Sequence, residues 1–160
     1  FYVIATDSVG NTSSPATHTW TIDTTAPSVT LTSVPNVLTN LTSATFGFSA
    51  VDMGGGSVSS YQCSLDGGAW SVCSSPKSYS SLAQGGHSFA VIANDSVGNI
   101  SAVVTYSWTI DTTAPGVTLS SAPNSLTNST TASFSFSGTD LGGGTVASYE
   151  CDLDDSGLAS

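Results

Sequence analysis

An eight-residue stretch of this chain occurs twice, 88 residues apart. Residues 20–27 read Trp-Thr-Ile-Asp-Thr-Thr-Ala-Pro, and residues 108–115 repeat them letter for letter. Three other landmarks keep the same spacing: residues 7–11 return at 95–99, the glycines 54–56 return at 142–144, and Cys63 returns at Cys151. A fixed period of this length is typical of domain arrays, in which each period folds as one unit. Such arrays act through length, stiffness and display more than through a catalytic pocket.

The register of the repeat predicts how the chain divides. Residues 1–27 are expected to be the C-terminal part of a truncated repeat plus a linker, and residues 28–115 a complete repeat plus a linker. Residues 116–160 are expected to be the N-terminal part of a further truncated repeat. We therefore expect a fragment of a longer array, whose two partial repeats are poorly stable alone because neither can bury a complete core.

The charge balance excludes several classes of function. One Lys or Arg stands against eleven Asp or Glu, which gives a formal net charge of −10, and the pI is about 4.1. A chain this acidic repels phosphate backbones and anionic membrane surfaces, so we expect no nucleic-acid partner. The sequence has no apolar run of transmembrane length and predicts no direct insertion into a membrane. Divalent cations are the natural partners of so many carboxylates.

Hydrophobic periodicity predicts an all-β fold. Aromatic and β-branched residues alternate with Ser and Thr, and Gly, Pro, Asn and Asp punctuate the runs. The expected strands of the complete repeat lie near residues 28–33, 44–51, 60–65, 69–73, 77–81, 88–94 and 103–110. Seven short strands with this patterning indicate an immunoglobulin-like antiparallel β-sandwich. Phe46, Phe48, Phe89 and Trp108 fall on the stripes expected to face its core.

Two cysteines flank a hairpin signal almost symmetrically. Asp66-Gly67-Gly68 predicts a tight turn between the strands near 60–65 and 69–73, so Cys63 and Cys73 can face each other across them. A disulfide there implies an oxidising, exported setting. A buried pair of free thiols and a metal site are alternatives, although the spacing fits neither a zinc knuckle nor a redox motif. Cys151 matches Cys63 and accounts for the odd cysteine.

The motifs together resemble the bacterial Ig-like repeats, fibronectin type III-like in topology, of very large secreted or surface proteins of the adhesin type. The resemblance rests on residues 61–70, on 82–89 with its glycines and His87, and on 95–99 and 108–115. One departure is residues 152–157, where the last repeat alters the hairpin of 65–68. The resemblance implies a non-enzymatic spacer in an extracellular or cell-surface protein, with neighbouring repeats as its partners. It also implies that other domains meet host or environmental glycans or proteins, and that calcium stiffens the junctions.

Counting strands brings acidic residues to the ends of the repeats. Because every strand crosses the sandwich, the linker before the first strand and the loops after the second and sixth strands share one end. Asp23, Asp52, Asp95 and Asn99 should therefore meet at one boundary, and Asp111 and Asp140 at the next. Carboxylate and amide oxygens with almost no nearby cation suit Ca²⁺. The alternative is that these residues only make turns, where Asp and Asn are common. No EF-hand pattern is present.

The remaining candidates favour structure over chemistry. His87 is expected to bond backbone at a corner, and no nucleophile elbow accompanies the many serines, so we expect no enzyme. Trp20 and Trp108 are expected in the core. Trp70 lies on a more exposed strand, where it either covers the disulfide or stacks on a sugar. The alternative to a spacer is therefore a carbohydrate- or protein-binding Ig-like module accessory to a secreted enzyme.

Overall fold

The computed structural model describes residues 1–154, and every regular element in that range is a β-strand. Within these residues no helix has the length and apolar character needed to span a membrane. The end of the expected partial repeat 116–160, and the last part of the altered hairpin at 152–157, lie outside the described residues.

Eight strands form a central β-sandwich, here called the middle sandwich. They are β3 (Ser28–Ser33), β4 (Leu38–Thr39), β5 (Ala44–Val51), β6 (Val58–Leu65), β7 (Ser71–Cys73), β8 (Lys77–Tyr79), β9 (Gly85–Asp95) and β10 (Val104–Ile110). One sheet has the order β3-β5-β8, and the other has the order β4-β10-β9-β6-β7. All neighbours are antiparallel except β4, which pairs with β10 in parallel. This two-sheet architecture is that of immunoglobulin-like and fibronectin type III-like domains.

Aromatic rings from both sheets fill the space between them. Phe46 of β5 is fully buried and stacks on Phe89 of β9, with ring centroids 4.1 Å apart and an interplanar angle of 9°. Trp108 of β10 also packs against Phe46, with ring centroids 5.1 Å apart. These residues alternate with Ser and Thr that point outward, because successive side chains of a strand face opposite sides of its sheet. The predicted core stripes are therefore confirmed for this sandwich.

The predicted strands match the observed ones closely, but several ends differ. β6 begins two residues earlier than predicted, and β8 ends two residues earlier than predicted. β3 and β5 begin and end as predicted, whereas β9 begins three residues earlier than predicted, at Gly85. The strand expected near 69–73 is shortened to Ser71–Cys73, so Trp70 precedes it. β4 was not predicted, because two residues give no alternation to read. Its pairing with β10 comes from tertiary contact rather than from local sequence.

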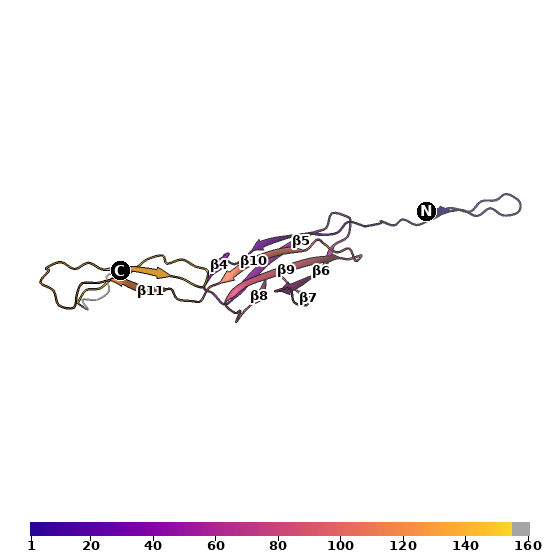
Figure 1. The fold of residues 1–160 in the computed structure, drawn as a ribbon. Coiled ribbons are helices and arrows are strands. Elements are labelled where there is room, and N and C mark those ends of the chain that lie inside the picture. The colour runs from indigo at the N-terminus through magenta and orange to yellow at the C-terminus, as the bar shows by residue number, and fades with distance from the viewer. Residues whose placement is uncertain (155–160) are drawn as a thin grey trace.

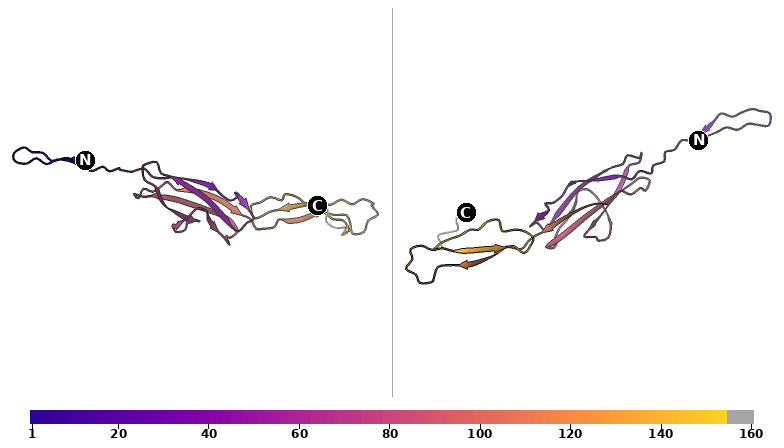
Figure 2. Two further views of the ribbon diagram at one scale, coloured as in Figure 1. Left: turned by 180° about the vertical axis from the view of Figure 1, so that it is seen from behind. Right: turned by 45° about the horizontal axis from the view of Figure 1, so that its top comes forward.

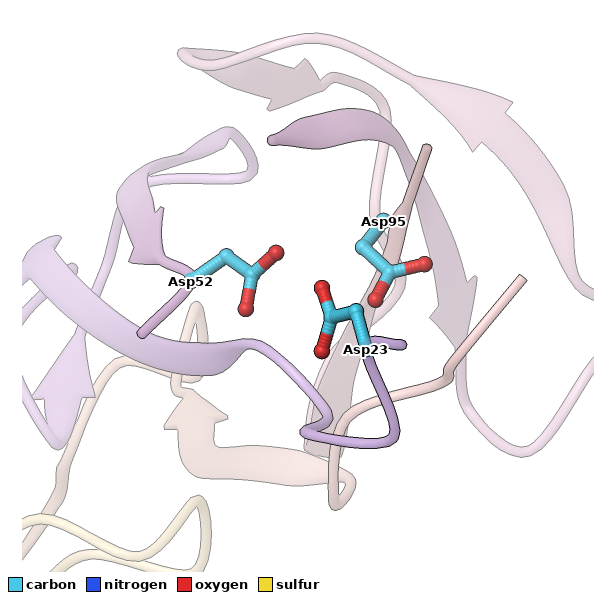
Figure 3. Close-up of side chains that lie close together, drawn as sticks. All are labelled: Asp23, Asp52 and Asp95. Atoms are coloured by element: carbon cyan, nitrogen blue, oxygen red, sulfur yellow. The ribbon is translucent and has the colours of Figure 1, made fainter. Parts of the chain in front are cut away.

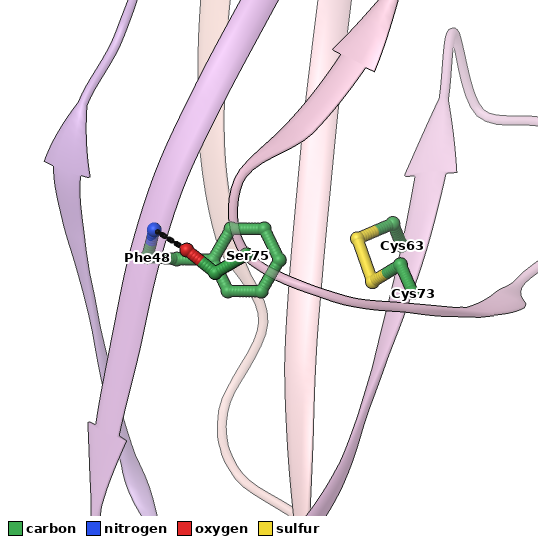
Figure 4. The surroundings of a disulfide bond; sticks show 4 residues. All are labelled: Phe48, Cys63, Cys73 and Ser75. Carbon is green, nitrogen blue, oxygen red and sulfur yellow. Dashed lines mark hydrogen bonds between the residues drawn. A yellow bond between two sulfur atoms is a disulfide. The ribbon is translucent and has the colours of Figure 1, made fainter.

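The predicted disulfide is present. Cys63 of β6 and Cys73 of β7 are joined with an S–S distance of 2.04 Å, and Cys63 is buried (Figure 4). Just beyond Cys73 the chain leaves the five-stranded sheet and crosses to β8 in the other one. The hydroxyl of Ser75 accepts a hydrogen bond from the backbone N–H of Phe48 at 2.9 Å on this crossing. Disulfide and hydrogen bond together fix where the chain changes sheets. Cys151 is an exposed free thiol.

Two smaller β-hairpins flank the middle sandwich, one at each end (Figures 1 and 2). The first hairpin is formed by β1 (Tyr2–Val3) and β2 (Ala16–Thr17), and the last hairpin by β11 (Gly116–Ser121) and β12 (Ser135–Thr139). β11 lies at the positions of β3 shifted by 88 residues. The three parts lie in a row, and residues 20–27 and 111–115 connect them.

The expectation that Trp20 is a core residue is wrong for this structure. Trp20 is 63 % exposed, whereas Trp108, at the matching position, is 2 % exposed. Trp108 is covered by Phe46 of the opposite sheet, and the first hairpin contains no opposite sheet. Among the described contacts, Trp20 stacks only on the ring of His18, 6.2 Å away. Burial of this tryptophan therefore depends on the second sheet and not on the local strand pattern.

Candidate metal centre at the linker

The turn between β9 and β10 fixes one carboxylate by itself. Oδ1 of Asp95 accepts hydrogen bonds from the backbone N–H groups of Val97, Gly98 and Asn99 at 2.7–2.9 Å. Oδ2 accepts a further bond from Nδ2 of Asn99 at 2.7 Å. Burial alone would raise the pKa of Asp95, but these hydrogen bonds, from the Asn99 side chain and then from the backbone, outweigh burial and lower it. Asp95 is therefore ionised although it is 3 % exposed.

The first hairpin makes the same turn at Asp7, where, among the described residues, no counterparts of Asp23 and Asp52 lie beside it. Oδ1 of Asp7 accepts hydrogen bonds from the N–H groups of Val9 and Asn11, and Oδ2 accepts one from Nδ2 of Asn11 at 2.7 Å. The pKa of Asp7 is lowered by the Asn11 side chain and then by backbone N–H groups. The turn is thus a local property of the repeated sequence, and it would form whether or not a metal were bound.

The loop after β5 supplies a carboxylate that is only half satisfied. Oδ1 of Asp52 accepts a hydrogen bond from the N–H of Gly54 at 3.0 Å. Oδ2 is buried and has no hydrogen-bond partner. A buried charged oxygen without a donor is unfavourable. This atom therefore requires an explanation that turn formation does not give.

The third carboxylate comes from the linker that precedes the middle sandwich. Oδ1 of Asp23 accepts a hydrogen bond from Thr25 N–H at 2.9 Å, and Oδ2 accepts one from Gly56 N–H at 2.8 Å. A Cβ at Gly54 would lie 1.9 Å from Oδ1 of Asp23. A Cβ at Gly56 would lie 2.7 Å from the Oδ2 atoms of both Asp23 and Asp52. Residues 54–56 thus surround the Asp23 carboxylate so closely that Cβ atoms at Gly54 and Gly56 would clash with it. We call these three residues the glycine cradle.

The three carboxylates converge, as Figure 3 shows. Asp23, Asp52 and Asp95 each offer one oxygen, and these three atoms lie within 4.8 Å of one another. Two oxygens on opposite sides of one Ca²⁺, each at about 2.4 Å, would be about 4.8 Å apart. Lys77, the one Lys or Arg of the sequence, lies instead over the ring of Tyr79. The donor set is all oxygen and carries three negative charges, so it fits a hard divalent cation.

Asn99 faces this cluster with its amide nitrogen. Nδ2 donates to Oδ2 of Asp95, to the carbonyl oxygen of Asp23 at 3.3 Å and to that of Thr25 at 3.4 Å. In this arrangement Asn99 ties the linker backbone to the β9–β10 turn. A role as a ligand through Oδ1, as the sequence suggests, stays a prediction.

The second linker repeats the arrangement with two of the carboxylates. The N–H of Gly144 donates to Oδ2 of Asp111 at 2.9 Å, and that of Gly142 donates to Oδ1 of Asp140 at 3.0 Å. A Cβ at Gly144 would lie 2.6 Å from Oδ2 of Asp140 and 3.0 Å from Oδ2 of Asp111. The linker carboxylate and the cradle therefore form without a β9–β10 turn beside them. The structure brings Asp111 and Asp140 together as the sequence predicts.

The sequence did not predict the residue of the middle sandwich that holds the second linker. Gln84, in the loop between β8 and β9, accepts hydrogen bonds at Oε1 from Thr112 Oγ1 at 2.7 Å and Thr112 N–H at 3.3 Å. Its Nε2 also donates to Oγ1 of Thr113. We call this group the exit clamp. A lone glutamine in a loop carries no pattern, although the repeated threonines it binds were visible in the sequence.

Trp70 stands apart from these acidic residues. It lies just before β7, at the edge of the five-stranded sheet, and is 42 % exposed. Val72, in the edge strand β7 that follows Trp70, is 75 % exposed. The metal candidates lie instead at the end of the sandwich where the first linker enters. Sugar stacking by Trp70 stays a prediction.

Comparison with known proteins finds similarity among solved structures alone. No protein-family model matches the chain, and no curated protein matches it. Among solved structures, fibronectin(III)-like modules of CbhA from Clostridium thermocellum are similar to it, with a TM-score of 0.42 and 20 % identity. The match covers 67 % of this chain and 58 % of that one, so the chain spans little more than half the length of this neighbour.

Proposed function

We propose that the chain is a non-enzymatic spacer from an exported bacterial surface or adhesin-like protein, in which successive sandwiches are held end to end. The observation that carries this proposal is the seating of Asp23 of the linker in the glycine cradle of the middle sandwich. A linker held by hydrogen bonds from the backbone of Gly56 and the side chain of Asn99 limits how far the two domains can swing. The row of parts in Figure 1 fits a molecule that provides length.

We further propose that Ca²⁺ binds at Asp23, Asp52 and Asp95. The orphaned oxygen of Asp52 supports this, because it lies beside the Asp23 carboxylate with no donor to satisfy it. When bound, the ion would neutralise the mutual repulsion of the three carboxylates. Asp23 belongs to the linker, whereas Asp52 and Asp95 belong to the sandwich, so ligation would join the two. Asn99 would keep the linker carbonyls in register with the β9–β10 turn.

An extracellular setting is consistent with both parts of the proposal. The Cys63–Cys73 disulfide fits an oxidising compartment. Calcium sites of extracellular modules commonly have dissociation constants of about 10⁻⁴–10⁻³ M, since the ion is abundant there. A site with three carboxylates, of which those of Asp23 and Asp52 are partly exposed, fits that range.

The calcium proposal is tested by thermal unfolding of the whole chain in 5 mM CaCl₂ and in chelator. With a dissociation constant in the range above, the ion should stabilise the middle sandwich by about 1–2 kcal/mol, or about 5–15 °C in Tm. Asp95→Asn should abolish this gain. Asp7→Asn makes the same change in an identical turn that lacks the other two carboxylates, so it should leave the gain intact. Equal melting curves with and without calcium would leave Asp23, Asp52 and Asp95 as turn residues.

The spacer proposal is tested separately by small-angle X-ray scattering of the whole chain in chelator. A row of parts gives a maximum dimension close to the length of the structure in Figure 1. Scattering that requires folded-back or widely distributed arrangements would contradict the spacer proposal and leave the metal site untouched.

A further inference from the structure

A histidine lies between the core and the exit clamp, with both ring nitrogens occupied. Nδ1 of His87 is 2.8 Å from Oδ2 of Asp66, in the turn between β6 and β7. Nε2 is 2.8 Å from the carbonyl oxygen of Ala83, in the loop between β8 and β9. Both partners are acceptors only, so both nitrogens must carry a proton for both hydrogen bonds to form. The geometry therefore selects the imidazolium form.

The surroundings of the ring favour the same form. The His87 side chain is 9 % exposed and stacks on Trp108, with ring centroids 5.4 Å apart. An aromatic face attracts a cation. The pKa of His87 is raised, first by the hydrogen bond to Ala83 and then by the one to Asp66, against the opposing effect of burial.

Asp66 is held in place for this role. Its Oδ1 accepts the N–H of Ser88 at 2.8 Å, and its own N–H donates to the Ser88 carbonyl at 2.8 Å. Burial alone would raise the pKa of Asp66, but the bonds from Ser88 and His87 lower it. The carboxylate is therefore anchored on β9 independently of His87. It can attract the histidine without moving toward it.

His87 binds the β8–β9 loop, and the same loop binds the linker that follows β10. Ala83 accepts the bond from Nε2, and the adjacent residue, Gln84, grips Thr112 and Thr113. Thr113 N–H in turn binds Oδ1 of Asp111, the carboxylate seated in the second glycine cradle. Hydrogen bonds on either side of the Ala83–Gln84 peptide bond thus connect His87 to the linker that follows β10.

We propose that His87 is a pH-dependent latch on the exit clamp. With both nitrogens protonated, it fixes the β8–β9 loop so that Gln84 holds Thr112 and Thr113. After loss of one proton, one of the two hydrogen bonds is replaced by a contact between lone pairs, and the loop and its grip loosen. The direction of the linker is then fixed at low pH and freer at high pH, with or without calcium.

The other ionisable groups near the ring do not supply this transition. β10 contributes Trp108, which does not titrate. Tyr79 on β8 has its pKa raised by burial and then by Asp66, so it stays protonated through neutral pH. Asp111 follows β10 at the same end, and its carboxylate accepts hydrogen bonds from the linker and the cradle. Within the described residues, His87 is therefore the group beside the loop that titrates near neutrality.

The sign of the effect follows from the raised pKa. The latch is closed below about pH 6.5, the ordinary histidine value, and opens as the pH rises through the higher pKa of the folded chain. Asp66 sets the lower limit, because its lowered pKa keeps it charged until the pH falls below its ordinary range.

Nuclear magnetic resonance of the whole chain in chelator tests the proposal. The amide of Thr112 donates to Gln84, so its chemical shift and its heteronuclear NOE report on the clamp. Between pH 5 and pH 8.5 both should change with the midpoint of the His87 ring protons, and the NOE should fall. His87→Gln should remove the transition, and His18→Gln should keep it. Gln84→Ala should leave Thr112 mobile at every pH.

A Thr112 amide that stays unchanged while His87 titrates would overturn the proposal, as would a transition that survives in His87→Gln. If His87→Gln does not fold, Asp66→Asn decides. It keeps the histidine and removes its carboxylate, so the midpoints of the ring and of Thr112 should move down together. A Thr112 midpoint that stayed in place while the ring midpoint moved would refute the latch. None of these outcomes depends on calcium.

Discussion

At the scale of single residues, the unpartnered oxygen of Asp52 distinguishes the two interpretations of the acidic cluster, a metal site or carboxylates that only stabilise turns. Asp95 is satisfied by its own turn, and Asp7 shows that this turn needs no ion. Asp23 is satisfied by Thr25 and Gly56. Only Oδ2 of Asp52 is buried among these carboxylates with no donor. Of the three carboxylates, that of Asp52 is therefore the one whose second oxygen gains no hydrogen bond from the fold, and a bound cation would account for it.

Changing Asp52 to Asn tests this argument. The substitution removes one of three crowded negative charges and supplies an N–H₂ group that can donate to Asp23. In chelator the Tm of the middle sandwich should therefore stay equal or rise by a few degrees, and the response to calcium should disappear. Calorimetry of the parent and Asp52→Asn, each with and without calcium, provides the measurement. A fall in Tm in chelator would show that Asp52 stabilises the loop without an ion.

The disulfide gives a second residue-scale prediction. Cys63 and Cys73 are ten residues apart, so their bond closes a short loop, and its removal should cost about 2–3 kcal/mol. Cys63→Ala with Cys73→Ala should lower the denaturant midpoint accordingly. Cys151→Ala, which removes the exposed free thiol, is the matched control and should leave it unchanged. Equal midpoints in all three proteins would contradict this assignment of stability.

Individual residues also show where sequence reasoning ends. Strand counting brought Asp23, Asp52 and Asp95 to one end because each adjoins a strand whose direction could be followed. Gln84 could not be found this way, since nothing in its local pattern distinguishes it from other polar loop residues. The pairing of His87 with Asp66 was missed for a similar reason: a corner histidine was expected to bond backbone, and it bonds backbone and a carboxylate.

At the scale of elements, the glycine cradle is the feature that attaches the linker to the middle sandwich, through the carboxylate of Asp23. Gly54 and Gly56 are in contact with the Asp23 carboxylate, and Gly142 and Gly144 are in the same relation to Asp111. The repeated glycines were visible in the sequence, but their role was not. The reason is that their partner lies about thirty residues earlier in the chain, and only the folded structure brings the two together.

Replacing Gly54 by Ala should unseat the linker. The new Cβ would lie 1.9 Å from Oδ1 of Asp23, so the carboxylate must leave the cradle. The hydrogen bond from Gly56 to Asp23 is then lost, and the amide signals of Thr25 and Gly56 should shift together. Gly86→Ala is the matched control, because nothing lies within 4 Å of its Cβ position. Unchanged linker amides in Gly54→Ala would contradict the cradle.

The strands themselves were largely predictable. Alternation located β3, β5 and β10 to within a residue, because each buries one complete stripe. β4 and the shortened β7 were not located correctly, because pairing partners decide where so short a strand begins and ends. Trp20 marks the same limit: its pattern is that of Trp108, but burial requires a second sheet.

At the scale of the whole molecule, the repeat makes matched experiments possible within one chain. Phe46 is fully buried between two sheets, whereas Phe134, at the same position 88 residues later, is 47 % exposed. Phe46→Ala should destabilise the middle sandwich by about 3–5 kcal/mol. Phe134→Ala should change the main unfolding transition by less than about 0.5 kcal/mol. Equal losses, measured by calorimetry, would mean that all three parts unfold as one cooperative unit.

The central claim is that the linker and the sandwich share one calcium ion, and a calcium titration followed by ¹⁵N–¹H correlation spectroscopy of the whole chain tests it most directly. The amides of Thr25, Gly54 and Gly56, and those of residues 97–99, bond the three carboxylates. The account predicts that these signals shift together and saturate at millimolar calcium, while the matching turn at residues 9–11 stays constant. Signals in both turns that drift equally and without saturation would show only screening by salt, and the claim would be wrong.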